Sequence, residues 1–225
     1  MTITYHPEIE QGSSEWYEIR QGIFTASEMN LLLTPTLKIA SNDKTRSHLY
    51  ELAAQRITKF VEPSYVSDAM LRGRADEVTA RGLYSANFWP VDECGFITND
   101  KFGFTIGYSP DGLVGDDGLI ECKSRAQKYQ LETILSLAIP AEHILQLQTG
   151  LLVSERQWID YVSYCGGMNM IVIRMYQDAE IHAAIEEATT KAETAIRKMV
   201  EDYLATINEK NIRTVPTQRG NENDE

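Results

Sequence analysis

The sequence predicts an α/β domain in which a mixed central sheet is flanked by helices. Two observations support this class. Apolar side chains recur at helical spacing in residues 45–60, and short β-type runs with turn residues between them follow in residues 95–123. Helices and strands that alternate along one chain are typical of an α/β fold. The 225 residues suffice for one such domain.

Two short helices separated by Gly22 are expected in residues 13–33. Ser13 is suited to cap the first helix, and Thr25 or Ser27 is suited to cap the second, because their side-chain oxygens accept hydrogen bonds from free backbone N–H groups. A glycine between two such segments ends the first helix.

The helix expected in residues 45–60 lies in the most basic long stretch of the chain. Its basic side chains, together with those just before and after it, are Lys38, Lys44, Arg46, Arg56 and Lys59. A solvated helix face is the ordinary interpretation of such charges. A surface that faces DNA is the alternative. A further helix is expected in residues 70–88.

Residues 95–98, 102–108 and 119–123 predict three strands of a meander, because turn dipeptides separate them. A helix is then expected in residues 140–152, with Pro140 at its start.

Two further strands are expected at residues 161–164 and 170–175, and a long acidic helix from residue 178 to about 207. We assign residues 1–215 to a single domain. Residues 216–225 are polar and predict a disordered tail.

Composition narrows the function. The formal net charge of −12 argues against a protein that coats nucleic acid, but it allows a nucleic-acid enzyme with a local basic groove. Three scattered cysteines favour a reducing, cytoplasmic compartment. The first residues do not have the pattern of a signal peptide, and no apolar run approaches the ~18 residues of a membrane span.

The chemically informative segment is YSPDGLVGDDGLIECKSR, residues 108–125. Glu121 and Lys123 are two apart on an expected strand, so their side chains share one face. Asp111 lies at the turn before that strand and is expected beside them. Hard carboxylate ligands suit Mg²⁺ or Mn²⁺. Lys123 is then expected to orient the attacking water, to help deprotonate it and to offset charge on the phosphorane.

Each part of this pattern is common by itself. An isolated Glu-x-Lys usually marks an exposed strand edge, and Ser-Pro-Asp-Gly is an ordinary turn. Here the charges stand inside the apolar run Leu-Ile-Glu-Cys-Lys. Burying them is costly unless they are paired or bind a metal, so the combination favours a functional site.

The segment SPDGL…IECK resembles the motif of the PD-(D/E)xK nucleases, and further segments resemble the lambda-type (YqaJ-like) phage alkaline exonucleases. Those segments are W-x-x-x-R-x-G followed by T-A-S-E from Trp16, G-x-x-x-E from Gly73 to Glu77, and Q-x-Q at residues 146–148. The matches occur in the family's order across residues 13–158.

The resemblance implies roles for named residues. Asp111 and Glu121 match the metal carboxylates, the backbone carbonyl of Cys122 a further ligand, and Glu77 a carboxylate for a second metal ion. Lys123 matches the catalytic lysine. Gln146 matches the glutamine that orients this lysine or the nucleophilic water.

A second group matches residues that hold the 5′-phosphate or the DNA end in the family. Arg20, Ser27 and Ser109 match the phosphate pocket, and arginine suits it because its planar fork binds phosphate in a bidentate manner. Met70 falls where the family uses an apolar wedge to part the duplex, although a core methionine is an equally good interpretation.

The sequence departs from the family after Lys123. A further arginine of the pocket is expected there, but SRAQKY has a different length and pattern, so Arg125 or Lys128 takes that place. The branch of these nucleases with an iron–sulfur cluster needs four cysteines and is excluded by the three in this chain.

The resemblance implies a restriction-endonuclease-like PD-(D/E)xK core and a Mg²⁺-dependent 5′→3′ exonuclease, with two ions per active site and Mn²⁺ as a substitute. It would digest one strand of linear double-stranded DNA and leave 3′ single strands for phage recombination. A homotrimeric ring, a single-strand annealing partner and a phage or prophage protein in the bacterial cytoplasm are also implied. The alternatives are an endonuclease of the same fold and a non-catalytic protein that binds DNA ends.

Overall fold

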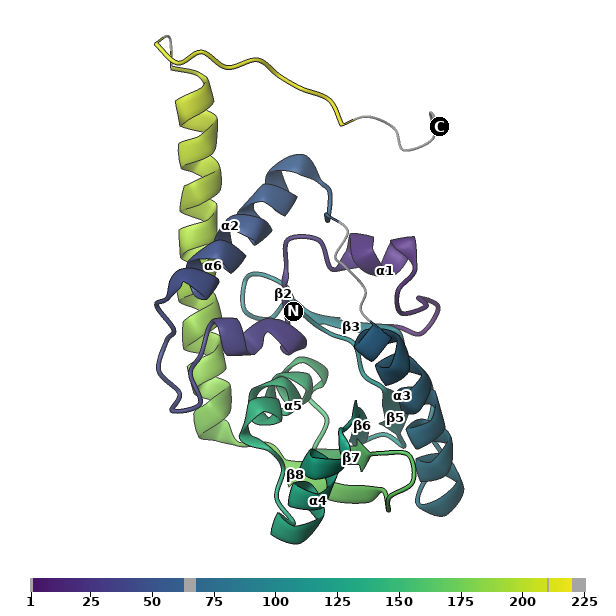
Figure 1. Cartoon of the computed structure of the whole chain (residues 1–225). Helices are drawn as coiled ribbons and strands as arrows, with labels where there is room; N and C mark the ends of the chain where they lie inside the picture. Colours follow the sequence, from purple (N-terminus) through teal and green to yellow (C-terminus); the bar gives the residue numbers. More distant parts are fainter. Residues whose placement is uncertain (1, 63–67, 210, 220–225) are drawn as a thin grey trace.

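The computed structural model describes residues 2–62, 68–209 and 211–219 (Figure 1). It confirms the α/β class: two mixed sheets of four strands each are flanked by helices. Part of the polar tail expected at residues 216–225 lies outside the described residues. Among the helices of the described part, none combines the length and apolar character needed to cross a membrane.

The first sheet has the strand order β1–β3–β4–β2. Its strands are β1 (Ile3–His6), β2 (Phe24–Thr25), β3 (Phe96–Asn99) and β4 (Ile106–Tyr108). β3 pairs antiparallel with β1 and β4, and β2 pairs in parallel with β4. The sequence analysis missed β1 and β2, because two to four residues are too few for a periodic pattern.

The second sheet has the strand order β5–β6–β7–β8. Its strands are β5 (Gly112–Val114), β6 (Gly118–Ser124), β7 (Trp158–Tyr164) and β8 (Ile171–Tyr176). β6 pairs in parallel with β7 and antiparallel with β5. The expected three-stranded meander is therefore wrong: the chain leaves the first sheet after Tyr108 and starts the second at Gly112.

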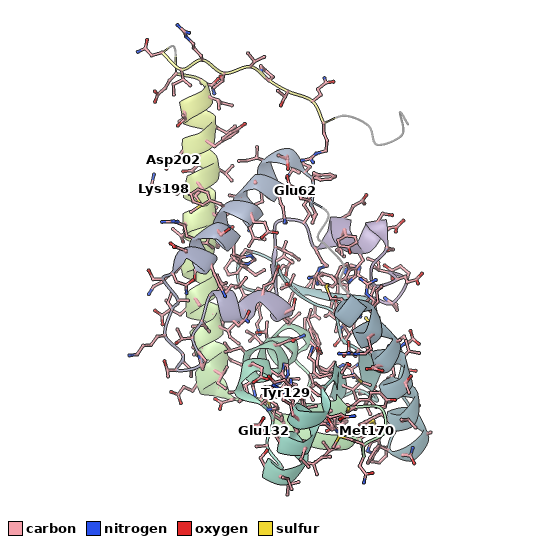
Figure 2. All side chains as sticks on the ribbon, in the orientation of Figure 1. Glu62, Tyr129, Glu132, Met170, Lys198 and Asp202 are labelled. Atoms are coloured by element: carbon pink, nitrogen blue, oxygen red, sulfur yellow. The ribbon has the colours of Figure 1, made fainter. Side chains whose placement is uncertain are left out.

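Helices surround the two sheets (Figure 1). They are α1 (Ser14–Ile19), α2 (Asp43–Thr58), α3 (Asp68–Asn87), α4 (Gln127–Ser136), α5 (Ala141–Ser154) and α6 (Ala179–Ile207). α6 runs along one side of the molecule and contacts α2, whereas α3 lies on the opposite side against β6. The sequence analysis missed α4, which is marked by Tyr129 and Glu132 in Figure 2.

The second short helix expected near the N-terminus is a 3₁₀ helix that covers only Ala26–Leu31. Thr25 occupies its N-cap position, but its side chain does not cap the helix. It contacts Ser27 and Glu28 instead. The first helix agrees with the prediction, since the Ser13 hydroxyl accepts the Trp16 N–H at 3.2 Å.

Strand β6 lies between two apolar clusters. Leu119 belongs to the main core, which also contains side chains of α2, α5 and α6. Ile120 and Cys122 belong to a smaller cluster with Tyr84 of α3. Because strand side chains alternate between faces, Glu121 and Lys123 share the face of Leu119. The packing of β6 therefore determines the face on which its charged side chains project.

Candidate active site

The centre of the site is the pair of charged side chains on β6. The Lys123 ammonium donates to Glu121 Oε1 at 2.7 Å, as expected from residues two apart on a strand. Asp111, in the turn between β4 and β5, lies beside them, and its Oδ2 accepts the Cys122 N–H at 2.6 Å. The structure thus brings together the three residues of the motif.

Glu121 is 2 % exposed, and donors from three elements hold its carboxylate. Besides Lys123, the Gln146 amide of α5 donates to Oε1 at 2.6 Å, and the Tyr108 hydroxyl of β4 donates to Oε2 at 2.7 Å. Gln146 therefore contacts the partner of Lys123. Tyr108 has no counterpart among the sequence-predicted site residues; its position three residues before Asp111 was the one available signal.

Three carboxylates crowd this centre. Burial and the charges of Glu121 and Glu77 raise the pKa of Asp111 well above its ordinary value. Burial also raises the pKa of Glu77, as does the Glu121 charge, against the opposing charges of Arg81 and Lys123. Such crowding disfavours the ionised forms and favours any cation that enters the site.

Lys123 remains a cation in this surrounding. Burial by itself would lower its pKa, but the charges of Glu121 and Asp111 raise it above the ordinary lysine value. A protonated lysine donates hydrogen bonds and carries charge, but it cannot accept a proton. Lys123 is therefore a hydrogen-bond donor and a positive charge at this centre.

The donor set fits a hard divalent cation. Asp111 and Glu121 supply buried carboxylate oxygens, and the Cys122 carbonyl directly follows Glu121 on β6. Both carboxylates keep acceptor capacity beyond their present hydrogen bonds. In the part of the chain that the structure describes, however, no three His, Cys, Asp or Glu side chains form a ready-made metal cluster. The fit therefore rests on two carboxylates and a backbone oxygen.

A second polar group lies on the N-terminal side of Asp111. Arg20 Nη1 donates to Ser109 Oγ at 3.3 Å, and its Nη2 donates to Thr25 Oγ1 at 3.5 Å. Thr25 in turn contacts Ser27 at 3.3 Å. The indole N–H of Trp16 also donates to Ser109, at 2.9 Å. The structure thus brings Arg20, Ser27 and Ser109 into one cluster, which we call the anion group.

The Arg20 guanidinium is held over an aromatic ring. It lies 4.0 Å from the ring centroid of Trp16, and burial lowers its pKa. Stacking leaves the edges of the guanidinium plane for hydrogen bonds. Because Ser109 is two residues before Asp111, the anion group adjoins the carboxylate centre.

Arg125 is engaged elsewhere. Its guanidinium approaches His143 Nε2 at 3.0 Å and Glu142 Oε1 at 3.3 Å, both on α5. His143 stacks on Tyr161, and burial together with the Lys123 and Arg125 charges lowers its pKa to about 4. Arg125 is therefore placed on the Lys123 side of the site, with contacts distinct from those of Arg20.

The other sequence-predicted residues are spread over α2 and α3. Met70 lies on α3 and is 48 % exposed, so it is not a core methionine. Lys44, Arg46 and Lys59 are exposed, as a DNA-facing surface requires. Arg56 is not: it pairs with Glu193 of α6 at 2.7 Å. Of the basic residues considered for a DNA-facing surface, Arg56 is therefore engaged inside the fold instead.

Arg81 is a further neighbour of the site that sequence reasoning missed. It donates to the Asp111 carbonyl at 3.2 Å and pairs with Glu77 at 3.5 Å and Glu93 at 3.3 Å. These residues, together with Trp16, line a cavity of about 630 Å³ next to the carboxylate centre. An arginine one turn after Glu77 on α3 was its sequence signal.

Comparisons with known proteins identify the family of this chain. Residues 15–157 match the model of the YqaJ-like viral recombinase domain. No curated protein matches the chain. The crystal structure of an alkaline exonuclease, LHK-Exo from Laribacter hongkongensis, is 30 % identical and has a TM-score of 0.77; the alignment covers 87 % of this chain and 98 % of that one.

Two more structures are similar. LHK-Exo in complex with dAMP is 31 % identical, with a TM-score of 0.78 and the same coverage of 87 % and 98 %. A phage-related exonuclease from Haemophilus somnus 129PT shares the fold at 10 % identity, with a TM-score of 0.60 and coverage of 83 % and 99 %. With a family match over more than half of its length, this chain belongs to the YqaJ-like viral recombinase domain family, whose solved relatives here are exonucleases.

Proposed function

We propose that this protein is a Mg²⁺-dependent exonuclease that digests one strand of linear double-stranded DNA in the 5′→3′ direction. It acts on 5′-phosphorylated ends, releases mononucleotides and leaves 3′ single strands for recombination by strand annealing. The observation that carries the proposal is the carboxylate and lysine centre of Asp111, Glu121 and Lys123 beside the anion group. The carboxylate and lysine centre would then hydrolyse the DNA, and the adjoining anion group would bind its terminal phosphate.

Asp111, Glu121 and the Cys122 carbonyl would hold the first metal ion, and Glu77 would contribute to a second. A bound Mg²⁺ supplies Lewis-acid stabilisation of the phosphoryl oxygens and a more acidic water. Mn²⁺ takes the same oxygen ligands and is expected to substitute. The crowded carboxylates gain most from such an ion, because it removes the repulsion that raises the pKa of Asp111.

The chain's own groups perform the remaining work. The Lys123 ammonium, held by Glu121, is placed to donate to the scissile phosphate as negative charge develops there. Gln146 and Tyr108 fix the Glu121 carboxylate from two sides, so the lysine keeps one orientation. The anion group then binds the 5′-phosphate through the fork of Arg20 and the two serine hydroxyls.

Two features of the relatives support the proposal. LHK-Exo binds dAMP, which is a nucleoside 5′-monophosphate, the class of product that such an exonuclease releases. The family is named for a viral recombinase domain, which agrees with a phage or prophage role beside a single-strand annealing protein. A homotrimeric ring that encloses the duplex is the assembly we expect.

The direct experiment compares linear and circular DNA. An end-labelled linear duplex and a closed circular plasmid are incubated with the protein and Mg²⁺. We expect mononucleotides from the linear duplex, starting at its 5′ end, and an intact plasmid. Nicking of the plasmid would favour an endonuclease. Binding to ends without cleavage in either substrate would favour a non-catalytic protein.

A further inference from the structure

The turn between α1 and β2 is held by side chains of α2. Gly22 in this turn has φ of +67°, a conformation that glycine adopts without strain. Its N–H donates to Gln55 Oε1 at 2.8 Å, and its carbonyl accepts Arg56 Nε at 2.7 Å. Both backbone polar groups of Gly22 are therefore used by two consecutive residues of α2.

Arg56 is itself fixed by a buried carboxylate of α6. Its Nη1 and Nη2 donate to the two oxygens of Glu193 at 3.0 and 2.7 Å. Arg197 donates to the same carboxylate at 2.6 Å. The Glu193 side chain is 8 % exposed, and although burial favours a higher pKa, the two arginines lower it. Lys198 and Asp202 form an exposed pair farther along the same helix (Figure 2).

This network ends next to the anion group. Gly22 is two residues after Arg20 and three residues before Thr25, and those two side chains contact each other. The Gly22 turn thus connects Arg20 to Thr25, the two residues whose side chains meet in the anion group. The fit is tight, because a Cβ built at Gly22 would lie 2.6 Å from Arg56 Cγ. A shift of Arg56 is expected to move the turn and with it the Arg20 backbone.

We propose that Glu193, acting through Arg56, is a positioning residue for the 5′-phosphate subsite. The inference rests on the proposed function, since it assumes that Arg20 binds a terminal phosphate. Buried ion pairs are poor sources of stability, but they can specify one geometry, and here the bidentate pair leaves Arg56 Nε aimed at the Gly22 carbonyl. Helix α6 thereby influences phosphate recognition without touching DNA.

The experiment measures discrimination between two DNA ends. Blunt linear duplexes that differ only in a 5′-phosphate or a 5′-hydroxyl on the digested strand are compared by kcat/KM. The wild type is expected to prefer the phosphate by about 10–100-fold, and Arg20→Ala to lose this preference. Glu193→Gln is expected to lower the ratio by about 3–10-fold, chiefly through a higher KM for the phosphorylated end.

Matched variants separate positioning from folding. Glu187→Gln makes the same change on the same helix, but in an exposed pair with Lys191, and should keep the wild-type ratio. Arg56→Lys retains the charge but has one donor group where three contacts are made, so it should lower the ratio as Glu193→Gln does. If Glu193 had a purely structural role, its substitution would lower kcat/KM equally for both substrates, because less of the protein would be folded. Circular dichroism measures that folded fraction.

The outcomes are distinct. An unchanged ratio in folded Glu193→Gln, with a wild type that prefers the phosphate, would overturn the inference but not the proposed function. A wild-type ratio near one would contradict the phosphate pocket itself and the inference with it. If Glu193→Gln does not fold, the ratio of Arg56→Lys decides.

Discussion

At the scale of single residues, the site is organised around a carboxylate that is almost fully buried. Glu121 accepts hydrogen bonds from Lys123, Gln146 and Tyr108, which come from β6, α5 and β4. A buried charge is tolerated only when its hydrogen-bond capacity is largely satisfied. The same contacts fix Lys123, so one set of hydrogen bonds both satisfies a buried charge and orients the lysine that we propose to be catalytic.

Lys123→Ala is expected to lower kcat by roughly 10²-fold or more, with DNA binding nearly unchanged. The ammonium acts on charge that develops only near the transition state, so its loss affects turnover rather than binding. Single-turnover cleavage and DNA binding in Ca²⁺ measure the two effects separately. Lys191→Ala, an exposed lysine on α6, should behave as the wild type. Normal turnover by Lys123→Ala would remove this residue from the site.

His143 is expected to make stability depend on pH. Its pKa is lowered to about 4 in the folded protein, below the value near 6.5 of an unfolded chain. Between these values the unfolded state binds more protons than the folded state, so stability decreases as the pH falls from 6.5 towards 4. Over this pH interval the free energy of unfolding should decrease in both proteins. We expect the decrease in His143→Gln to be smaller than in the wild type by on the order of 2 kcal/mol.

Urea unfolding at pH 8, 6 and 4.5 tests the His143 prediction. At pH 8 His143 is neutral in both the folded and the unfolded state. A difference in the free energy of unfolding at this pH therefore reports only the change in packing caused by the substitution, and it adds a constant offset at the lower pH values. The remaining titratable groups are the same in both proteins and cancel in the difference. Parallel pH profiles for the two proteins would show that His143 is protonated in the folded state as easily as in the unfolded one.

At the scale of elements, the position of α3 relative to the second sheet matters most, because α3 carries Glu77. Tyr84 of this helix is fully buried, and its hydroxyl donates to Asp160 of β7 at 2.6 Å. Asp160 also accepts two bonds from Arg174 of β8, which stacks on Trp158 at 3.5 Å. About two turns earlier in the helix, Ser124 of β6 donates to Asp76. Two polar tethers thus hold α3 on the sheet.

Tyr84→Phe should reduce the free energy of unfolding by about 1–3 kcal/mol, because it removes a donor from a buried carboxylate and leaves the ring in place. The expected decrease in Tm is about 2–4 °C per kcal/mol for a chain of this size. Thermal unfolding at one fixed protein concentration measures it. Tyr203→Phe, an exposed tyrosine on α6, is the control. Equal Tm values for Tyr84→Phe and the wild type would mean that this tether contributes nothing.

At the scale of the whole molecule, the net charge and the need to stay on one DNA strand both lead us to expect a ring. A net charge of −12 gives little general attraction to DNA, so an exonuclease that stays on its strand needs another means of attachment. A head-to-tail interface that closes by rotation gives a ring that can enclose the duplex. Of the basic residues on α2 and its ends, Lys44, Arg46 and Lys59 are exposed and can face such a channel, whereas Arg56 cannot.

Light scattering under active conditions should give three times the subunit mass. Reversing Arg46 and Lys59 to Glu should shorten each digestion run without changing the carboxylate centre, because both side chains are exposed and make none of its hydrogen bonds. A mass near one subunit would eliminate the ring. Unchanged run lengths in the double variant, with a trimeric wild type, would place these residues outside the channel.

The sequence alone determined the fold class, most helices and the chemical centre. Periodic spacing located α2 and α6, because long segments with one apolar face leave a pattern in the order of residues, and Pro140 marked the start of α5. The spacing of Glu121 and Lys123 determined that they share a face, since strand geometry is local. The family signature identified Arg20, Ser27 and Ser109 before any contact among them was known.

Tertiary structure decided what depends on distant partners. The division into two sheets, the short strands β1 and β2, and α4 have no strong local pattern, so pairing and packing determine them. Arg56 has the same sequence character as Arg46, yet one pairs with a buried carboxylate 137 residues away and the other is exposed. A charge run specifies neither partner nor burial, because both are set by which helices pack together.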